Sequence, residues 1–324
     1  MNVAVCGLGS QVAQVGVIPA LRRSRWTQFL GGTTRSRATA EHVLTGAERH
    51  YRDYDAILSD PDVEAVYLPL PNDLHLDFIA AAVLAHKHVL CEKPLLLSDD
   101  QYDRLERIVA SSTTRVSEAF MSSYHPRLRE VIATCSSGEF GEVLSVSTAF
   151  TGTLAPLDGY RLNARRGGGS LYDVGIYALF PIVALLGADP REISVVTKVT
   201  PTTPPVDLTM HCLMEFDDGR AATFVTSFVS GESQSLRILT QQASIAVDRT
   251  CTPTPLDVDW TLTTSAGVTI RRSLGCDPYQ AMIDEVFEAF TQGREPSWNL
   301  SRSRQVAQLL HRINRTWRED RAQP

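Results

Sequence analysis

A turn with two glycines, close to the start of the chain, has the residue types that bind a pyrophosphate group. Gly7 and Gly9 follow an apolar run at residues 3–6 (VAVC), which is typical of a buried parallel strand, and precede an expected helix at 11–23. The first glycine permits the tight turn, and the second lets a pyrophosphate approach the backbone at the helix N-terminus. Two glycines can also form an ordinary turn. Their place at the first strand-to-helix junction favours a dinucleotide-binding loop made of Gly7, Gly9, Ser10, Gln11 and Val12, although Val12 stands where Gly or Ala is usual.

The end of the second expected strand carries hydroxyl and guanidinium groups. Domains that prefer NAD usually have Asp or Glu about 20 residues after the glycine turn, where it binds the ribose 2′-hydroxyl. This chain has TTRSR at residues 33–37, with no carboxylate, and these groups suit a 2′-phosphate. We therefore expect NADP(H), with NAD(H) less favoured, bound through Thr34, Arg35, Ser36 and Arg37. The alternative is a solvated basic loop that does not distinguish NADP(H) from NAD(H).

The elements that position these two loops alternate between strand and helix. Pro19 is expected to bend or interrupt the first helix. Repeated strand–helix units imply a parallel, doubly wound sheet covered by helices on both faces, so residues 1–121 are predicted to form an α/β, NADP-binding domain. The predicted strands are 3–6, 27–33, 63–70, 88–91 and 115–120, and the helices are 11–23, 36–46, 73–85 and 98–110.

From about residue 122 the pattern changes to a second domain. Helices are expected at 126–136 and 170–186, and two amphipathic helices close the chain. The residues DDG at 217–219 form a hairpin signal between two strands. We therefore predict that residues 122–324 form an α+β domain with a large, mostly antiparallel open sheet. Its strands are predicted at 142–150, 192–200, 208–216, 220–229, 235–240, 243–248, 257–264 and 267–273.

Composition and charge exclude several classes of protein. The chain has 324 residues and a net charge of −6, which does not suggest the basic face needed for nucleic acid or anionic membrane. No apolar run is long enough for a membrane helix, and no secretory signal is evident. The six cysteines form no C-x-x-C motif, and no metal site is expected. These observations predict a cytoplasmic protein with reduced thiols.

Two motifs outside the glycine turn resemble the Gfo/Idh/MocA oxidoreductase family. The first comprises VYLPLPNDLH at residues 66–75 and KHVLCEKPL at 87–95. The second comprises YRLN at 160–163 and GGGSLYDVGIYAL at 167–179. The resemblance covers essentially the whole chain. It implies an N-terminal Rossmann domain and a C-terminal domain whose open sheet often mediates oligomerisation, hence a homodimer or homotetramer. It also implies hydride transfer at a carbinol or ketone carbon, usually of a sugar-like ring.

The resemblance further implies which residues form the site. Lys93 would point toward the nicotinamide, and Asp173 and Tyr177 lie one helical turn apart, so both can face the cleft. These three residues would be catalytic and, with Tyr160, would bind substrate. The cofactor would also contact Leu70, Pro71, Asn72, His75, Glu92, Lys93 and Arg161.

The chemistry of such a group can be argued independently. Reduction of a ketone needs a hydride on carbon and a proton on the developing alkoxide. A phenol near Lys93 can supply that proton, because the ammonium lowers the pKa of the tyrosine, and Lys93 can also bond the substrate oxygen. The structural alternatives are that Tyr177 packs its helix face, that Asp173 bonds the helix backbone and that Lys93 is solvated.

The substrate is indicated by two further similarities. The residues AVDRTCTP at 246–253 and FMSSYHP at 120–126 are similar to segments of the nucleotide-sugar 3-ketoreductases, although Cys251 replaces their usual aromatic. The leading hypothesis is NADPH-dependent reduction of the 3-keto group of a dTDP-linked deoxyhexose in deoxysugar biosynthesis. Arg161, Arg165 and Arg166 could attract its diphosphate. The alternatives are a dehydrogenase of a free sugar, aminosugar or trans-dihydrodiol, and a non-catalytic NADP-binding sensor.

Overall fold

The chain folds into two compact units. The computed structural model describes residues 1–154 and 159–322. The first unit comprises Met1–Met121 and Asp277–Ser303, and the second comprises Ser122–Cys276 and the residues from Arg304 onward. Residues 277–303 were expected in the second domain, but in the structure they pack with the first unit. The reason is local: Ser24 donates a hydrogen bond to Asp284 (2.5 Å), and Arg23 pairs with Asp277.

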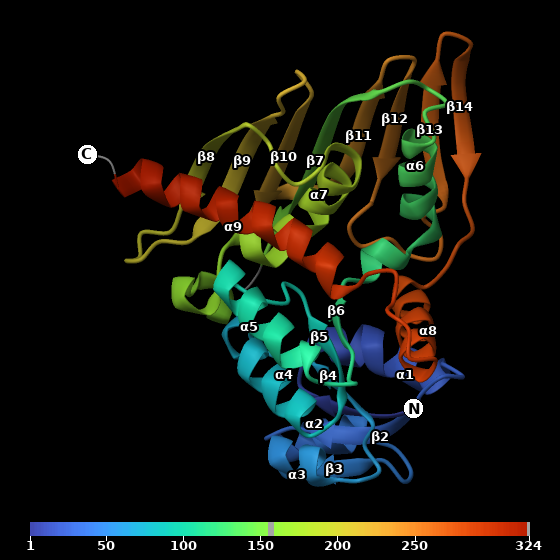
Figure 1. Cartoon of the computed structure of the whole chain (residues 1–324), viewed down its shortest axis with the longest axis vertical. Helices are drawn as coiled ribbons and strands as arrows, with labels where there is room; N and C mark the ends of the chain where they lie inside the picture. Colours follow the sequence, from blue (N-terminus) through green and yellow to red (C-terminus); the bar gives the residue numbers. More distant parts are fainter. Residues whose placement is uncertain (155–158, 323–324) are drawn as a thin grey trace. The chain divides into compact units, whose positions relative to one another are not determined.

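The first unit is built on a six-stranded sheet whose order is β3-β2-β1-β4-β5-β6 (Figure 1). All five strand pairs are parallel, which confirms the predicted doubly wound architecture. The short edge strand β3 was not predicted, because its three residues show no apolar alternation. The strands are β1 Asn2–Cys6, β2 Gln28–Thr33, β3 Arg49–Tyr51, β4 Ala65–Leu68, β5 His88–Glu92 and β6 Val116–Ala119.

The helices of this unit differ from the prediction in two ways: the short helix α3 (Tyr54–Ser59) was not predicted, and the first helix changes type along its length. It opens with a π-helical segment, η1 (Ala13–Val17), and Pro19 lies in the first turn of α1, where its missing N–H costs no intrahelical bond. The helix thus changes from π to α type just before Pro19, where a bend or an interruption was expected. The other helices are α2 Arg37–Val43, α3 Tyr54–Ser59, the 3₁₀ turn η2 Asn72–Leu74, α4 His75–Leu84, α5 Asp99–Ala110 and α8 Pro278–Thr291, and α1 spans Ile18–Arg23.

The second unit contains an eight-stranded sheet of order β14-β13-β12-β11-β7-β10-β9-β8. Only the interior pair β7–β10 is parallel among its described strands, so the predicted mostly antiparallel sheet is confirmed. The strands are β7 Val143–Thr153, β8 Glu192–Val199, β9 Asp207–Glu215, β10 Ala221–Ser227, β11 Val229–Thr240, β12 Ala243–Asp248, β13 Asp259–Thr264 and β14 Gly267–Arg272.

Helices cover one face of this sheet (Figure 1). On that face Thr148 of β7 donates a hydrogen bond to the carbonyl of Ala178 in α7 (3.0 Å). The helices are α6 Pro126–Ser136, α7 Ser170–Leu186 and α9 Leu300–Ala322, and the 3₁₀ turns are η3 Met121–Tyr124, η4 Gly159–Leu162 and η5 Ala164–Arg166. None of the helices in the described ranges combines the length and the apolar character needed to cross a membrane.

Candidate active site

The glycine turn follows β1 directly and leaves its backbone open on one side. Gly7 has φ +140°, and Leu8 N donates to Thr33 O at the end of β2 (2.8 Å). An added Cβ at Gly7 would lie 3.3 Å from the Pro69 ring, whereas one at Gly9 would meet no atom within 4 Å. The backbone at Gly9 is therefore accessible to a pyrophosphate, as the dinucleotide-binding loop requires.

The stretch after β2 presents its side chains to solvent at the start of α2. Ser36 caps this helix by accepting a hydrogen bond from Thr39 N (3.2 Å), and Thr34 Oγ1 accepts one from Ser36 N. Arg35 is exposed, whereas Arg37 pairs with Glu41 of the same helix (2.7 Å). Arg35 is thus the better placed of the two arginines for a 2′-phosphate. The pairing of Arg37 with Glu41 was not anticipated from the sequence.

His75 joins the loop after β4 to the loop after β5. Its Nε2 lies 2.9 Å from Leu70 O, and its Nδ1 lies 3.1 Å from both Pro94 O and Leu95 O. The imidazole is fully buried, and that burial lowers its pKa. His75 therefore holds the two loops that carry Asn72 and Lys93, and its predicted contact with a cofactor stays a prediction.

Ionisable groups on three elements interact electrostatically with the half-buried Lys93. The Tyr67 hydroxyl donates to Glu92 Oε1 (2.7 Å), and Glu118 of β6 accepts a hydrogen bond from Leu95 N (2.7 Å). Burial raises the pKa of both carboxyl groups, and the charge of Lys93 opposes that rise. Tyr279 of α8 belongs to the same group: burial is the largest cause that raises its pKa to about 12, while Lys93 acts to lower it.

The N-terminus of helix α7 in the second unit is capped by a carboxylate from strand β9. Asp207, at the start of β9, accepts hydrogen bonds from Ser170 Oγ (2.7 Å) and Leu171 N (2.8 Å). Gly169, with φ +111°, leaves no room for a side chain, because an added Cβ would lie 2.1 Å from Asp207 Oδ1. Burial raises the pKa of Asp207 to about 6. The sequence motif included this helix but not the residue that caps it.

Asp173 and Tyr177 lie one and two turns along α7. Arg161 Nε donates to Asp173 Oδ2 (2.7 Å), and the Asp173 side chain is only 13% exposed. The guanidinium also lies over the Tyr160 ring (4.9 Å). Tyr177 packs edge-on against Phe150 of β7, with ring centroids 5.2 Å apart. The structure thus brings Tyr160 and Arg161 of η4 together with Asp173 of α7, the helix that also carries Tyr177.

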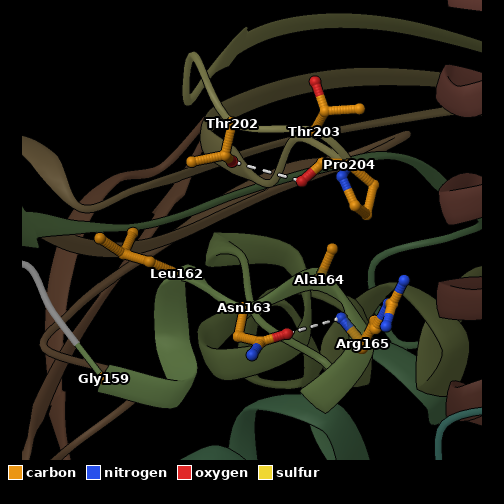
Figure 2. Close-up of a pocket in the computed structure, with 8 residues that line it drawn as sticks. All are labelled: Gly159, Leu162, Asn163, Ala164, Arg165, Thr202, Thr203 and Pro204. Atoms are coloured by element: carbon orange, nitrogen blue, oxygen red, sulfur yellow. Dashed lines mark hydrogen bonds between the residues drawn. The ribbon is translucent and has the colours of Figure 1, made fainter.

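A cavity of about 480 Å³ adjoins the segment that carries Arg161. One wall is formed by residues of 159–165 and the other by the turn Thr202–Pro204, as Figure 2 shows. Arg165 lies at one end, and its backbone N–H donates to Asn163 Oδ1 (3.0 Å). Every described residue that lines this cavity is neutral or basic. Elsewhere, the described residues contain no group of three or more His, Cys, Asp or Glu that could hold a metal ion.

A parallel six-stranded sheet with an open glycine turn defines a dinucleotide-binding protein, here joined to a second unit with a large sheet. Residues 1–120 match the family described as "Oxidoreductase family, NAD-binding Rossmann fold", and residues 127–246 match its "GFO/IDH/MocA C-terminal domain". The chain belongs to the Gfo/Idh/MocA family of NAD(P)-dependent oxidoreductases.

Curated relatives from several organisms are similar to the chain. An uncharacterized oxidoreductase of Rhizobium meliloti is 32% identical over 94% of this chain and 93% of its own. A D-xylose 1-dehydrogenase (NADP(+)) of Haloferax volcanii is 30% identical over 92% and 91%. A dTDP-3,4-didehydro-2,6-dideoxy-alpha-D-glucose 3-reductase of Actinomadura kijaniata is 38% identical over 45% of this chain and 44% of its own.

Among solved structures, KijD10 of Actinomadura kijaniata is similar over nearly the whole chain. This 3-ketoreductase, crystallised with NADP and TDP-benzene, is 26% identical, with a TM-score of 0.89 and 97% coverage of both chains. The likeness extends through both units of the fold.

Proposed function

We propose that the chain is an NADPH-dependent reductase of the 3-keto group of a dTDP-linked deoxyhexose. The observation that carries the proposal is its likeness, across 97% of both chains, to a 3-ketoreductase crystallised with NADP and a TDP compound. The partial match to a dTDP-sugar 3-reductase, at 38% identity, supports the same substrate class.

Tyr177 is proposed as the general acid. NADPH, when bound, supplies the hydride to the carbonyl carbon. As the C=O bond is reduced, the Tyr177 hydroxyl gives its proton to the developing alkoxide, and the phenolate then regains a proton from solvent. Lys93, as an ammonium, stabilises that phenolate and the substrate oxygen. Asp173, fixed by Arg161, is proposed to bind a sugar hydroxyl, because its carboxylate is held in one orientation.

The nucleotide end of the substrate is proposed to occupy the cavity beside Arg165. Its described lining is free of carboxylates, so a diphosphate would meet no repulsion there. The same segment carries Arg161, which is bonded to Asp173, and therefore the cavity adjoins the proposed sugar site. Arg165→Ala should raise KM for the nucleotide sugar about tenfold, while Arg107→Ala, at an exposed position of α5 outside the cavity, should not.

The cofactor is proposed to be NADP(H), bound by the glycine turn and by the stretch that contains Arg35. The support is the exposed guanidinium of Arg35 at the end of β2 and the open backbone at Gly9. A 2′-phosphate on the ribose would meet a cation there, and no carboxylate occupies residues 33–37.

The uncovered face of the large sheet is proposed to form a homodimer or homotetramer. Strand register places five exposed apolar side chains on the face opposite α7, and association with a second copy of the chain would remove them from water. These residues are Val196, Leu213, Leu239, Val268 and Ile270. Light scattering after gel filtration tests the assembly, and a monomer would contradict it.

All six cysteines are free thiols, which fits the cytoplasmic location that we propose.

A second candidate function is oxidation of a free sugar, aminosugar or dihydrodiol by the same residues. The observation that favours it is the D-xylose 1-dehydrogenase relative, which is similar over 92% of the chain. A non-catalytic NADP-binding sensor is the third possibility, and it would require that Lys93 and Tyr177 have no role.

Nicotinamide absorbance with a substrate panel separates these functions. NADPH should be consumed with a dTDP-linked 3-keto-deoxyhexose, and Tyr177→Phe and Lys93→Ala should each abolish turnover while NADPH still binds. Faster reduction of NADP⁺ by xylose or by a dihydrodiol would select the second function. Binding without turnover on the whole panel would select the sensor.

A further inference from the structure

Glu118 ties three segments of the first unit together around the loop that carries Lys93. Its side chain is on β6 and is only 1% exposed. Oε1 accepts a hydrogen bond from Leu95 N (2.7 Å), two residues after Lys93, and Oε2 accepts one from the indole N–H of Trp298 (3.0 Å). The Glu118 carboxylate is thus held from both sides, by the loop after β5 and by the segment that leads to α9.

Trp298 is itself anchored on β6. Its carbonyl accepts a hydrogen bond from Ser117 Oγ (3.1 Å), and its ring lies 4.9 Å from that of Phe120. The indole is 2% exposed, so its N–H has to bond within the protein. Replacement of this donor leaves the charge of Glu118 in place, which makes Trp298 useful as a control.

Burial raises the pKa of Glu118, and the charge of Lys93 acts to lower it. The charge of Lys93 acts to lower the pKa of titratable groups on three elements of this unit: Glu92 of β5, Glu118 of β6 and Tyr279 of α8. Glu92 and Glu118 are the carboxyl groups among them. A buried negative charge favours a neighbouring ammonium strongly, since little water screens the pair.

We propose that Glu118 is a positioning residue for Lys93: its carboxylate, which accepts the hydrogen bond of Leu95 N, fixes the loop two residues after the lysine and places a buried negative charge near the lysine side chain. The proposal rests on the proposed function, in which the Lys93 ammonium stabilises the phenolate of Tyr177. Of the two carboxyl groups, Glu92 is adjacent in the E-K-P motif, whereas Glu118 comes from another strand and was not anticipated.

The charge state of Lys93 can be measured without turnover, because the chain has only three lysines, Lys87, Lys93 and Lys198. Selective ¹³C labelling of lysine gives three Cε signals, and Lys93→Ala identifies the one of interest. Lys87, which donates to the Asp60 and Val63 carbonyls, and the exposed Lys198 serve as internal references. The pH titration is run on wild type, Glu118→Gln and Trp298→Phe.

Glu118→Gln should lower the pKa of Lys93 by about one unit or more, because it removes a buried negative charge. Trp298→Phe, which removes only the indole donor, should shift that pKa by less than about 0.3 units. An unchanged Lys93 titration in Glu118→Gln would overturn the proposal, and so would equal shifts in the two variants. Turnover by Lys93→Ala at the wild-type rate would instead overturn the proposed function, so the two failures are distinguishable.

Discussion

The backbone N–H of Leu171 donates a hydrogen bond to Asp207 Oδ2 (2.8 Å). A carboxylate of β9 therefore caps the N-terminus of α7, the helix that carries Asp173 and Tyr177. Gly169, at the N-cap, has no side chain to do this. An anion at a helix N-terminus satisfies otherwise unpaired N–H groups and interacts favourably with the helix dipole. The orientation of α7 therefore depends on a residue outside the sequence motif.

Asp207 should make stability depend on pH in a defined direction. Its pKa rises from an ordinary value of 3.8 to about 6, chiefly through burial, with the charge of Arg318 acting in the opposite sense. Because folding favours the protonated form, its contribution to stability is present at low pH and is lost as pH rises through this window. The loss amounts to about 3 kcal/mol.

Urea unfolding of wild type and Asp207→Asn checks this direction. From about pH 4 to pH 6 the free energy of unfolding of wild type should fall relative to that of the variant, and above pH 7 the difference should be constant. Parallel curves across the whole range would show that Asp207 titrates normally.

Arg161 should affect turnover through Asp173. Arg161→Met removes the 2.7 Å bond to the carboxylate, so Asp173 gains rotational freedom, and kcat/KM for the sugar should fall by roughly tenfold or more. Arg161→Lys should recover part of the loss. Arg191→Met removes an exposed ion pair with Glu215 and serves as the control. Steady-state kinetics that are equal for wild type and Arg161→Met would contradict this role.

Arg35 should determine the preference for NADPH more than Arg37 does. The guanidinium of Arg37 is engaged with Glu41, whereas Arg35 is exposed at the end of β2. Arg35→Ala should lower kcat/KM for NADPH about 10–100-fold and leave that for NADH nearly unchanged, with a smaller effect from Arg37→Ala. If wild type uses NADPH and NADH equally well, the expected preference is wrong.

Gly16 and Gly9 should respond differently to an added methyl group. A Cβ at Gly16 would lie 2.9 Å from the ring of Tyr279, so Gly16→Ala should destabilise the protein by about 1–3 kcal/mol. A Cβ at Gly9 meets no atom within 4 Å, and Gly9→Ala should weaken NADPH binding with little effect on Tm. Calorimetry and cofactor titration measure the two effects. Equal Tm values for Gly16→Ala and wild type would be the contrary result.

Most elements could be predicted from local patterns. The apolar run of β1 and the hairpin signal before β10 each depend on a few adjacent residues, and both predictions are confirmed. The packing of α8 with the first unit could not be predicted, because an apolar helix stripe does not specify its partner. The short strand β3 was missed since two of its three residues are exposed.

The site was only partly predictable for the same physical reason. The resemblance to the Gfo/Idh/MocA family implied Lys93, Asp173 and Tyr177, and their catalytic roles stay predictions. The groups that hold them come from distant positions: Asp207 lies 36 residues from Leu171, and Glu118 lies 180 residues from Trp298. A charged residue inside the predicted strand 115–120 was the one available signal for Glu118.

The central claim is that the chain transfers a hydride from NADPH to carbon 3 of a dTDP-linked sugar. The most direct measurement uses NADPH that is deuterated at carbon 4 of the nicotinamide, a dTDP-linked 3-keto-deoxyhexose and NMR analysis of the product. We predict that deuterium is bonded to carbon 3 with wild type and that no labelled product forms with Tyr177→Phe. Deuterium at another carbon, or a sugar recovered without label, would contradict the account.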